Sequence, residues 1–157
     1  MDNNGDVSSK EFLSPFYYNE QVTYYQYGGS RDLSNSPAGI GDVVYHLHNL
    51  FDKRIMVLFT SIRALTDTAK YLSSLPDGRN LPLFAQVRGA SRPSIIKGMH
   101  QTSNGILFGT NSFWEGVDLP GELLEILVLV KLPFDVPSEP LVRSYSDHVN
   151  RMGGNSF

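Results

Sequence analysis

The residues best suited to chemistry lie in one short segment, GTNSFWEGVD, at positions 109–118. Gly109 ends an apolar run, and a glycine at a strand end lets a ligand approach the backbone because it has no Cβ. Small donors suited to phosphate oxygens come next: Thr110, Asn111 and Ser112. Glu115 and Asp118 could accept hydrogen bonds from sugar hydroxyls, as acidic residues do in other nucleotide-binding folds. The segment therefore suggests a phosphate-bearing ligand.

Packing alone also accounts for this segment. Trp114, the only tryptophan in the chain, would then fill a gap at the edge of a sheet, and Gly116 would permit a turn. The two carboxylates would simply face water. Residue types in the loop do not decide between packing and ligand binding, so the elements that position it matter.

The spacing of apolar residues predicts strands alternating with helices. Apolar runs typical of buried strands occupy residues 55–59, 81–87, 105–109 and 124–132. Helical spacing is found in residues 40–51, 62–72, 91–100 and 141–152, where Thr60-Ser61 and Ser138 can act as caps. Residues 14–27 alternate in polarity and predict a further strand that ends at Gly28-Gly29. This order indicates an α/β fold with a mainly parallel sheet flanked by helices on both faces.

Parallel sheets place ligand-binding loops beyond the carboxyl ends of their strands. Two loops are expected there, FTSIR at positions 59–63 and GTNSFWEGVD at positions 109–118.

Composition describes an ordinary globular domain and excludes several classes of protein. The 157 residues carry a net charge of −3, which gives no overall attraction to nucleic acid, and no cysteine is present for disulfides or thiolate metal sites. No apolar run reaches the roughly 18 residues of a membrane span. The first residues lack the pattern of a signal peptide, so we predict a cytoplasmic protein without a membrane partner. Residues 1–12 predict a flexible lead-in, and residues 13–157 a single domain.

Two other groups of residues give weaker signals. His46 and His48 would point about 200° apart on a helix, which favours a solvated face, and no metal site is predicted. Arg88, Arg92 and Lys97 could form a basic patch that meets phosphates, although ordinary surface charge explains them as well. No serine or histidine has the spacing of a catalytic triad.

Six stretches together resemble one family over most of the chain. GTNSFWEGVDLPG resembles motif V of superfamily 2 helicases of the DinG/XPD type, and its Ser-Phe-Trp-Glu-Gly string is most similar to that of bacterial DinG-like proteins. SPFYYNEQ resembles the start of their second RecA-like domain, and IMVLFTSIRAL resembles motif IV. FAQVRGASR resembles the next strand end, and KLPFDVPSEPLV with GGNSF resembles the approach to motif VI.

The resemblance implies that residues 13–157 are the second, C-terminal RecA-like domain of an ATP-dependent helicase that moves 5′ to 3′ along single-stranded DNA. It implies DNA contacts for these residues: Thr60, Ser61, Gly109, Thr110, Ser112 and Trp114. It implies ATP contacts for these residues: Glu115, Gly116 and Asp118. Phe113 and Trp114 could stack on a base, worth about 1–3 kcal/mol, or pack beneath the loop.

Several parts of the family's machinery do not occur in the sequence. It contains no GxxxxGK[ST] phosphate loop and no acidic metal box, and it ends before motif VI with its arginine finger. ATP with Mg²⁺ would therefore be held mainly by the first RecA-like domain, the expected partner, and no catalytic residue is assigned here. The chain alone should not hydrolyse ATP, and the missing last strand and helix could expose a sheet edge. Two alternatives stay open: a catalytically silent interaction module, and an unrelated α/β nucleotide-binding domain.

Overall fold

The computed structural model describes residues 10–29, 32–87, 90–110, 113, 117, 119–133 and 140–155. By its internal contacts the chain divides into two units, Met1–Arg31 and Asp32–Phe157. None of the described helices is long and apolar enough to span a membrane.

The first unit contains little regular structure. Its only described helix is the single turn α1 (Tyr18–Gln21), and no described residue from position 10 to position 29 lies in a strand. The prediction of a strand over residues 14–27 is therefore wrong. Alternation of polarity is not sufficient for a strand, because the backbone also needs a partner to pair with. Large apolar side chains of this unit are exposed: Phe12, Leu13, Phe16, Tyr17, Tyr18, Val22, Tyr24, Tyr25 and Tyr27.

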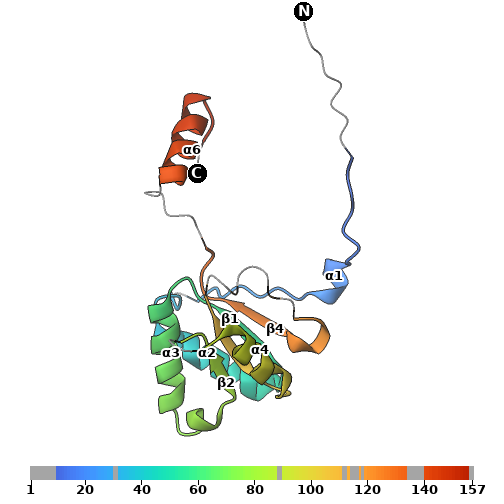
Figure 1. The fold of residues 1–157 in the computed structure, drawn as a ribbon, viewed down its shortest axis with the longest axis vertical. Coiled ribbons are helices and arrows are strands. Elements are labelled where there is room, and N and C mark those ends of the chain that lie inside the picture. Colours follow the sequence, from blue (N-terminus) through green and yellow to red (C-terminus); the bar gives the residue numbers. More distant parts are fainter. Residues whose placement is uncertain are drawn as a thin grey trace, which may run out of the picture. The chain divides into compact units, whose positions relative to one another are not determined.

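The second unit is built on a four-stranded sheet that is parallel throughout, as predicted. Its strands are β1 (Ile55–Leu58), β2 (Leu83–Ala85), β3 (Ile106–Gly109) and β4 (Ile126–Leu129), in the order β2-β3-β1-β4 (Figure 1). Ile55 of β1 lies opposite Ile106 of β3 and Ile126 of β4. The two central strands, β1 and β3, are buried along their whole length.

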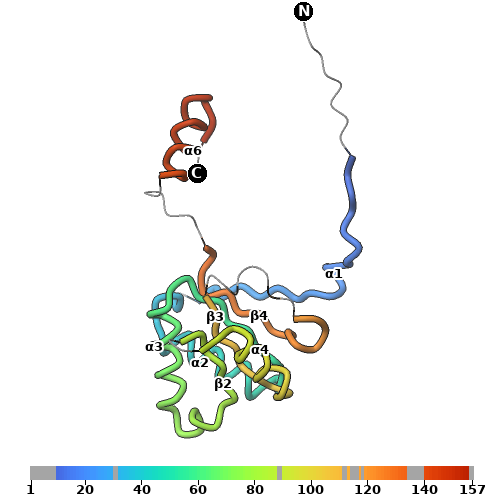
Figure 2. Tube along the Cα trace, in the orientation of Figure 1, coloured from blue at the N-terminus to red at the C-terminus, as the bar shows by residue number. Residues whose placement is uncertain are grey.

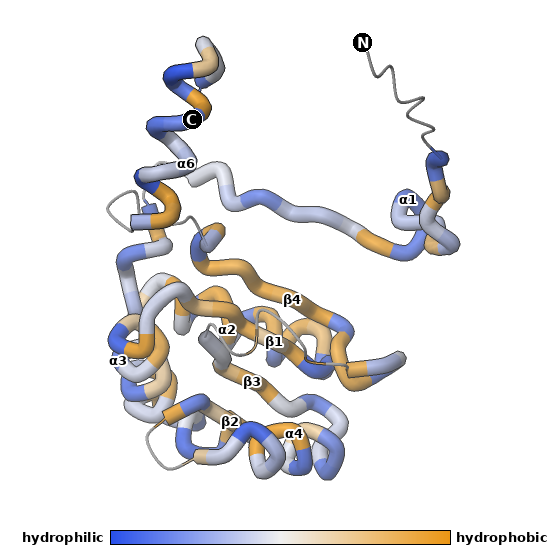
Figure 3. Tube along the Cα trace, turned by 45° about the horizontal axis from the view of Figure 1, so that its top comes forward, coloured by the Kyte–Doolittle hydropathy of each residue, from blue (hydrophilic) through white to orange (hydrophobic). Residues whose placement is uncertain are grey.

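Helices cover both faces of the sheet. The α2 helix (Pro37–Phe51) and the α3 helix (Ile62–Ser74) contribute to one apolar cluster, together with Ile55, Val57 and Phe59. The α4 helix (Arg92–His100) contributes to a second cluster, which contains Met56 and Leu58. Successive side chains of β1 thus enter opposite layers, as the pleat of a strand requires. Figure 2 follows the chain from β2 through α4 to β3, and Figure 3 shows that β1, β3 and β4 are mostly hydrophobic while α3 and α4 alternate between hydrophilic and hydrophobic residues.

Serine caps begin all three of these helices. Ser36, Ser61 and Ser91 each accept a hydrogen bond from a backbone N–H in the first turn of α2, α3 and α4. Such caps satisfy donors that have no partner inside the helix. The turn after α3 contains the 3₁₀ helix η1 (Gly78–Asn80), and a second 3₁₀ helix, η2 (Gly121–Leu123), precedes β4.

The last two elements exist as predicted but are less buried than expected. β4 is an edge strand in which half-buried and exposed positions alternate, with Leu127 50% and Leu129 44% exposed. The expectation that every strand is buried on both faces is therefore wrong for β4, because only the Ile126 and Val128 side is packed against the core. The α6 helix (Pro140–Arg151) has no buried residue, and Leu141 and Tyr145 of its apolar stripe are exposed. Its expected cap, Ser138, lies outside the described residues.

Candidate nucleic-acid interface

The carboxyl ends of the four parallel strands bring several polar residues to one edge of the sheet. Thr60 and Ser61 follow β1 directly after Phe59, and Thr110 follows β3. Gln86 follows β2, and Lys131 comes just after β4. This edge is where open α/β sheets bind ligands.

Thr60 and Ser61 are both exposed at this edge. Ser61 caps α3, because its Oγ accepts a hydrogen bond of 3.2 Å from the backbone N–H of Ala64. A hydroxyl that accepts one bond can still donate its proton. Ser61 can therefore hold the helix and donate to a phosphate oxygen at the same time.

The two residues line a hollow of about 380 Å³. Its walls come from the segment before α2, the start of α3 and the chain after β4. Its polar lining residues are Ser34, Asn35, Thr60, Ser61, Arg63, Asp67 and Lys131. Two cationic side chains and several small donors thus surround a space at the sheet edge, with one acid among them.

Hydrogen bonds connect one wall of this hollow. Lys131 Nζ donates to Asn35 Oδ1, and Asn35 Nδ2 donates to Asp32 Oδ2 over 3.0 Å. Asp32 Oδ1 accepts from the Ser34 backbone N–H at 2.8 Å. Hydrogen bonding from Ser34 is the main cause that lowers the pKa of Asp32, and the positive charge of Lys131 adds to it. Asp32 is therefore ionised at neutral pH and holds Asn35 in place.

Helix ends and cations bring positive groups to the hollow, next to the carboxylates of Asp32 and Asp67. Both α2 and α3 begin beside it, and helix N-termini carry partial positive charge. Arg63 lies 3.7 Å from Asp67, with its side chain 93% exposed, so this ion pair leaves the guanidinium accessible. Hydroxyl, amide and cationic donors together suit the backbone of a polyanion.

Thr110 is arranged differently, because it is only 6% exposed. Its backbone N–H and its hydroxyl both donate to Gln86 Oε1, each over 2.9 Å. A threonine hydroxyl has one proton, so it cannot donate to a phosphate while it donates to Gln86. The geometry gives Thr110 a role in fixing the end of β3, and its contact with DNA stays a prediction.

Gly109 allows a close approach, but the group that approaches is the protein's own Phe113. A Cβ built on Gly109 would lie 2.6 Å from Phe113 Cβ and 2.7 Å from its Cγ. Phe113 is 3% exposed, and the guanidinium carbon of Arg92 lies 5.6 Å from the centre of its ring. Phe113 is thus a packing residue in this structure, and the binding role of Gly109 is not tested by its burial.

The other predicted residues of the loop lie outside the described residues. They are Ser112 and Trp114 on the expected DNA side and Glu115, Gly116 and Asp118 on the expected ATP side. Of the histidine pair, His46 is exposed while His48 is 9% exposed, so the solvated face expected for both holds only for His46. Within the described ranges, no three His, Asp or Glu side chains gather as metal ligands.

Sequence reasoning missed Asn35, Arg63 and Lys131 as lining residues of the hollow. Arg63 stood in the FTSIR loop that was expected at a strand end, and Lys131 directly follows the last apolar run. Applying the carboxyl-end rule to every strand would have found both. Asn35 carries no such signal, because it precedes α2 and joins the site only through the fold.

The fold and the hollow define a RecA-like α/β domain with a polar edge. The chain belongs to the helicase C-terminal domain family, whose model matches residues 44–157. It is 33% identical over 150 residues to the "3'-5' exonuclease DinG" of Bacillus subtilis, covering 92% of this chain and 16% of that protein. It is 35% identical over 105 residues to the "ATP-dependent DNA helicase DinG" of Photobacterium profundum, covering 65% of this chain and 15% of that protein.

A third relative is the "ATP-dependent DNA helicase YoaA" of Escherichia coli, 28% identical over 149 residues, with 92% of this chain and 22% of the relative covered. The chain is thus a C-terminal, DinG-like helicase domain, as the motif resemblance predicted. It spans less than a quarter of the length of each of these relatives.

Proposed function

We propose that this chain is the second motor domain of an ATP-dependent DNA helicase that moves 5′ to 3′ and that its role is to hold single-stranded DNA. The names of the DinG and YoaA relatives support helicase action on DNA. The observation that carries the proposal is the hollow at the carboxyl edge, where Thr60 and Ser61 stand beside Arg63 and Lys131. These hydrogen-bond donors and cations match the oxygens of a phosphate backbone, which positions a strand without specifying its sequence.

The ATP side of the proposal depends on the segment from Gly109 to Asp118. Glu115, Gly116 and Asp118 would border a nucleotide held with Mg²⁺ mainly by a first RecA-like domain. The two hydrogen bonds from Thr110 to Gln86 support this proposal, because they fix the start of the segment to the sheet. The chain alone would bind DNA without turning over ATP.

Fluorescence anisotropy with a labelled oligo-dT strand tests the DNA side. Each phosphate contact with a single strand contributes about 0.7 to the slope of log affinity against log salt, so losing one contact costs about eightfold in affinity at about 50 mM salt. Arg63→Gln should reduce the salt slope by about 0.7 and lower the affinity about eightfold at about 50 mM salt. Arg79→Gln is the matched control, because Arg79 is exposed in η1, which follows the far end of α3.

Two results would contradict the proposal. One is a wild-type chain that fails to bind the strand even at low salt and high protein concentration. The other is an Arg63→Gln variant whose affinity and salt slope equal those of Arg79→Gln. Circular dichroism of both variants would exclude misfolding as the cause of a loss.

A further inference from the structure

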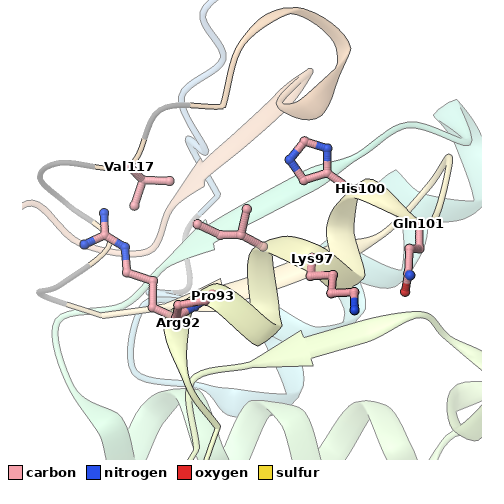
Figure 4. Close-up of a pocket in the computed structure, with 7 residues that line it drawn as sticks. Arg92, Pro93, Lys97, His100, Gln101 and Val117 are labelled. Atoms are coloured by element: carbon pink, nitrogen blue, oxygen red, sulfur yellow. The ribbon is translucent and has the colours of Figure 1, made fainter.

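A second hollow lies along the outer side of α4, away from the hollow at Thr60 and Ser61. It measures about 690 Å³, and Arg92, Pro93, Ile96, Lys97, His100, Gln101 and Val117 line it (Figure 4). Arg92 and Val117 stand at one end, and His100 and Gln101 stand at the other. None of these seven described lining residues is acidic.

Helix geometry explains why these side chains gather. Ile95 and Met99 are buried in the cluster beneath α4 and fix the rotation of the helix. The lining residues of α4 fall within about half a turn of one another, at 100° per residue, on the outer side. Pro93, Ile96 and Val117 give the hollow an apolar floor, and Lys97 adds an exposed cation.

Two described residues of the segment that follows β3, Phe113 and Val117, lie beside this hollow. Val117 belongs to that segment and lines the hollow directly. Phe113 also belongs to it, and the Arg92 guanidinium lies over the Phe113 ring. α4 starts after β2 and leads into β3, so the hollow extends from the carboxyl edge of the sheet along one of its faces.

We propose that the hollow along α4 is a second contact surface for the same single strand of DNA. This inference rests on the proposed function. Lys97 and Arg92 would neutralise phosphates, and His100 and Gln101 can donate hydrogen bonds to phosphate oxygens even when uncharged. Sugar and base faces would lie on Pro93, Ile96 and Val117, because stacking and apolar contact tolerate any base. Arg63 and Lys131 at the carboxyl edge of the same sheet favour a polynucleotide, because one strand can contact both surfaces; an acidic peptide is the other ligand that the cations and apolar residues of this hollow could attract.

The test compares Lys97→Gln with Lys70→Gln in the same oligo-dT titration. Both changes remove one lysine charge from an exposed helix position, but Lys70 stands on α3, which packs against the opposite face of the sheet. Lys97→Gln should lower affinity about eightfold at about 50 mM salt and reduce the salt slope by about 0.7. Lys70→Gln should leave both quantities close to those of the wild-type chain.

The outcomes separate this inference from the proposed function. Equal affinities for Lys97→Gln and Lys70→Gln, with a loss in Arg63→Gln, overturn the α4 surface alone. No binding by the wild-type chain overturns both. If a labelled Glu-rich peptide with one terminal Phe binds the wild-type chain, loses affinity in Lys97→Gln, and is not displaced by excess oligo-dT, the hollow is a peptide site and the inference is wrong.

Discussion

The two hydrogen bonds between Thr110 and Gln86 give a prediction whose size follows from the structure. Thr110→Val removes the hydroxyl and keeps the backbone N–H bond to Gln86 Oε1. A single hydrogen bond contributes about 0.5–1.5 kcal/mol to stability, so we expect a loss of about 1 kcal/mol. Gln86→Met removes the acceptor for both donors, and a buried donor without a partner costs about 1–3 kcal/mol. With two such donors, the expected loss for Gln86→Met is about 2–6 kcal/mol.

The double variant provides the decisive measurement. Once Gln86 is Met, the Thr110 hydroxyl is a buried donor without this acceptor, so Thr110→Val should then gain about 1 kcal/mol instead of costing it. The coupling energy from urea unfolding of the four proteins should therefore be about 2 kcal/mol. In thermal unfolding, each 1 kcal/mol corresponds to about 2–4 °C for a chain of this size. A Thr110→Val cost that is the same in both backgrounds would show that the pair does not interact.

Two further predictions concern packing. Gly109→Ala should lose about 1–3 kcal/mol of stability by overpacking against Phe113, while Gly28→Ala, where a Cβ meets no atom within 4 Å, should be neutral in urea unfolding. Thr68 is fully buried, and its Oγ1 has no partner among the described residues, so Thr68→Val should gain about 1 kcal/mol. Thr66→Val is its control, since the Thr66 hydroxyl already donates to Ile62 O; an equal gain there would contradict the reasoning.

The central part of the fold was predictable because its signals are local. Continuous apolar runs identified β1 and β3, and the cap at Thr60-Ser61 before a helical stripe located the start of α3. β4 shows the limit of this reasoning. Its sequence ILVL is as apolar as that of a central strand, but strand order places it at the edge and leaves Leu127 and Leu129 exposed. The residue types of a strand indicate how unfavourable its exposure to water would be. They do not indicate which element, if any, packs against each face of the strand.

The candidate site likewise contains some features that local sequence patterns predicted and others that depend on the fold. Thr60 and Ser61 were predicted at a strand end, and the structure puts both of them in one hollow. Thr110 was predicted from its neighbours, but its partner Gln86 lies 24 positions earlier and meets it only because β2 pairs with β3. Asn35 and Lys131 are 96 positions apart and share a hydrogen bond across the hollow. Contacts of this kind depend on topology, which no local pattern encodes.

The alternating packing of β1 has a mechanical consequence. This strand leads directly into Thr60 and Ser61, and its side chains also support α4 through Met56 and Leu58. A shift of one residue in its register would turn every side chain to the opposite layer, which the two apolar clusters forbid. β1 therefore fixes the spacing between the two surfaces proposed to contact DNA. A single strand bound to both surfaces would have to span that fixed distance.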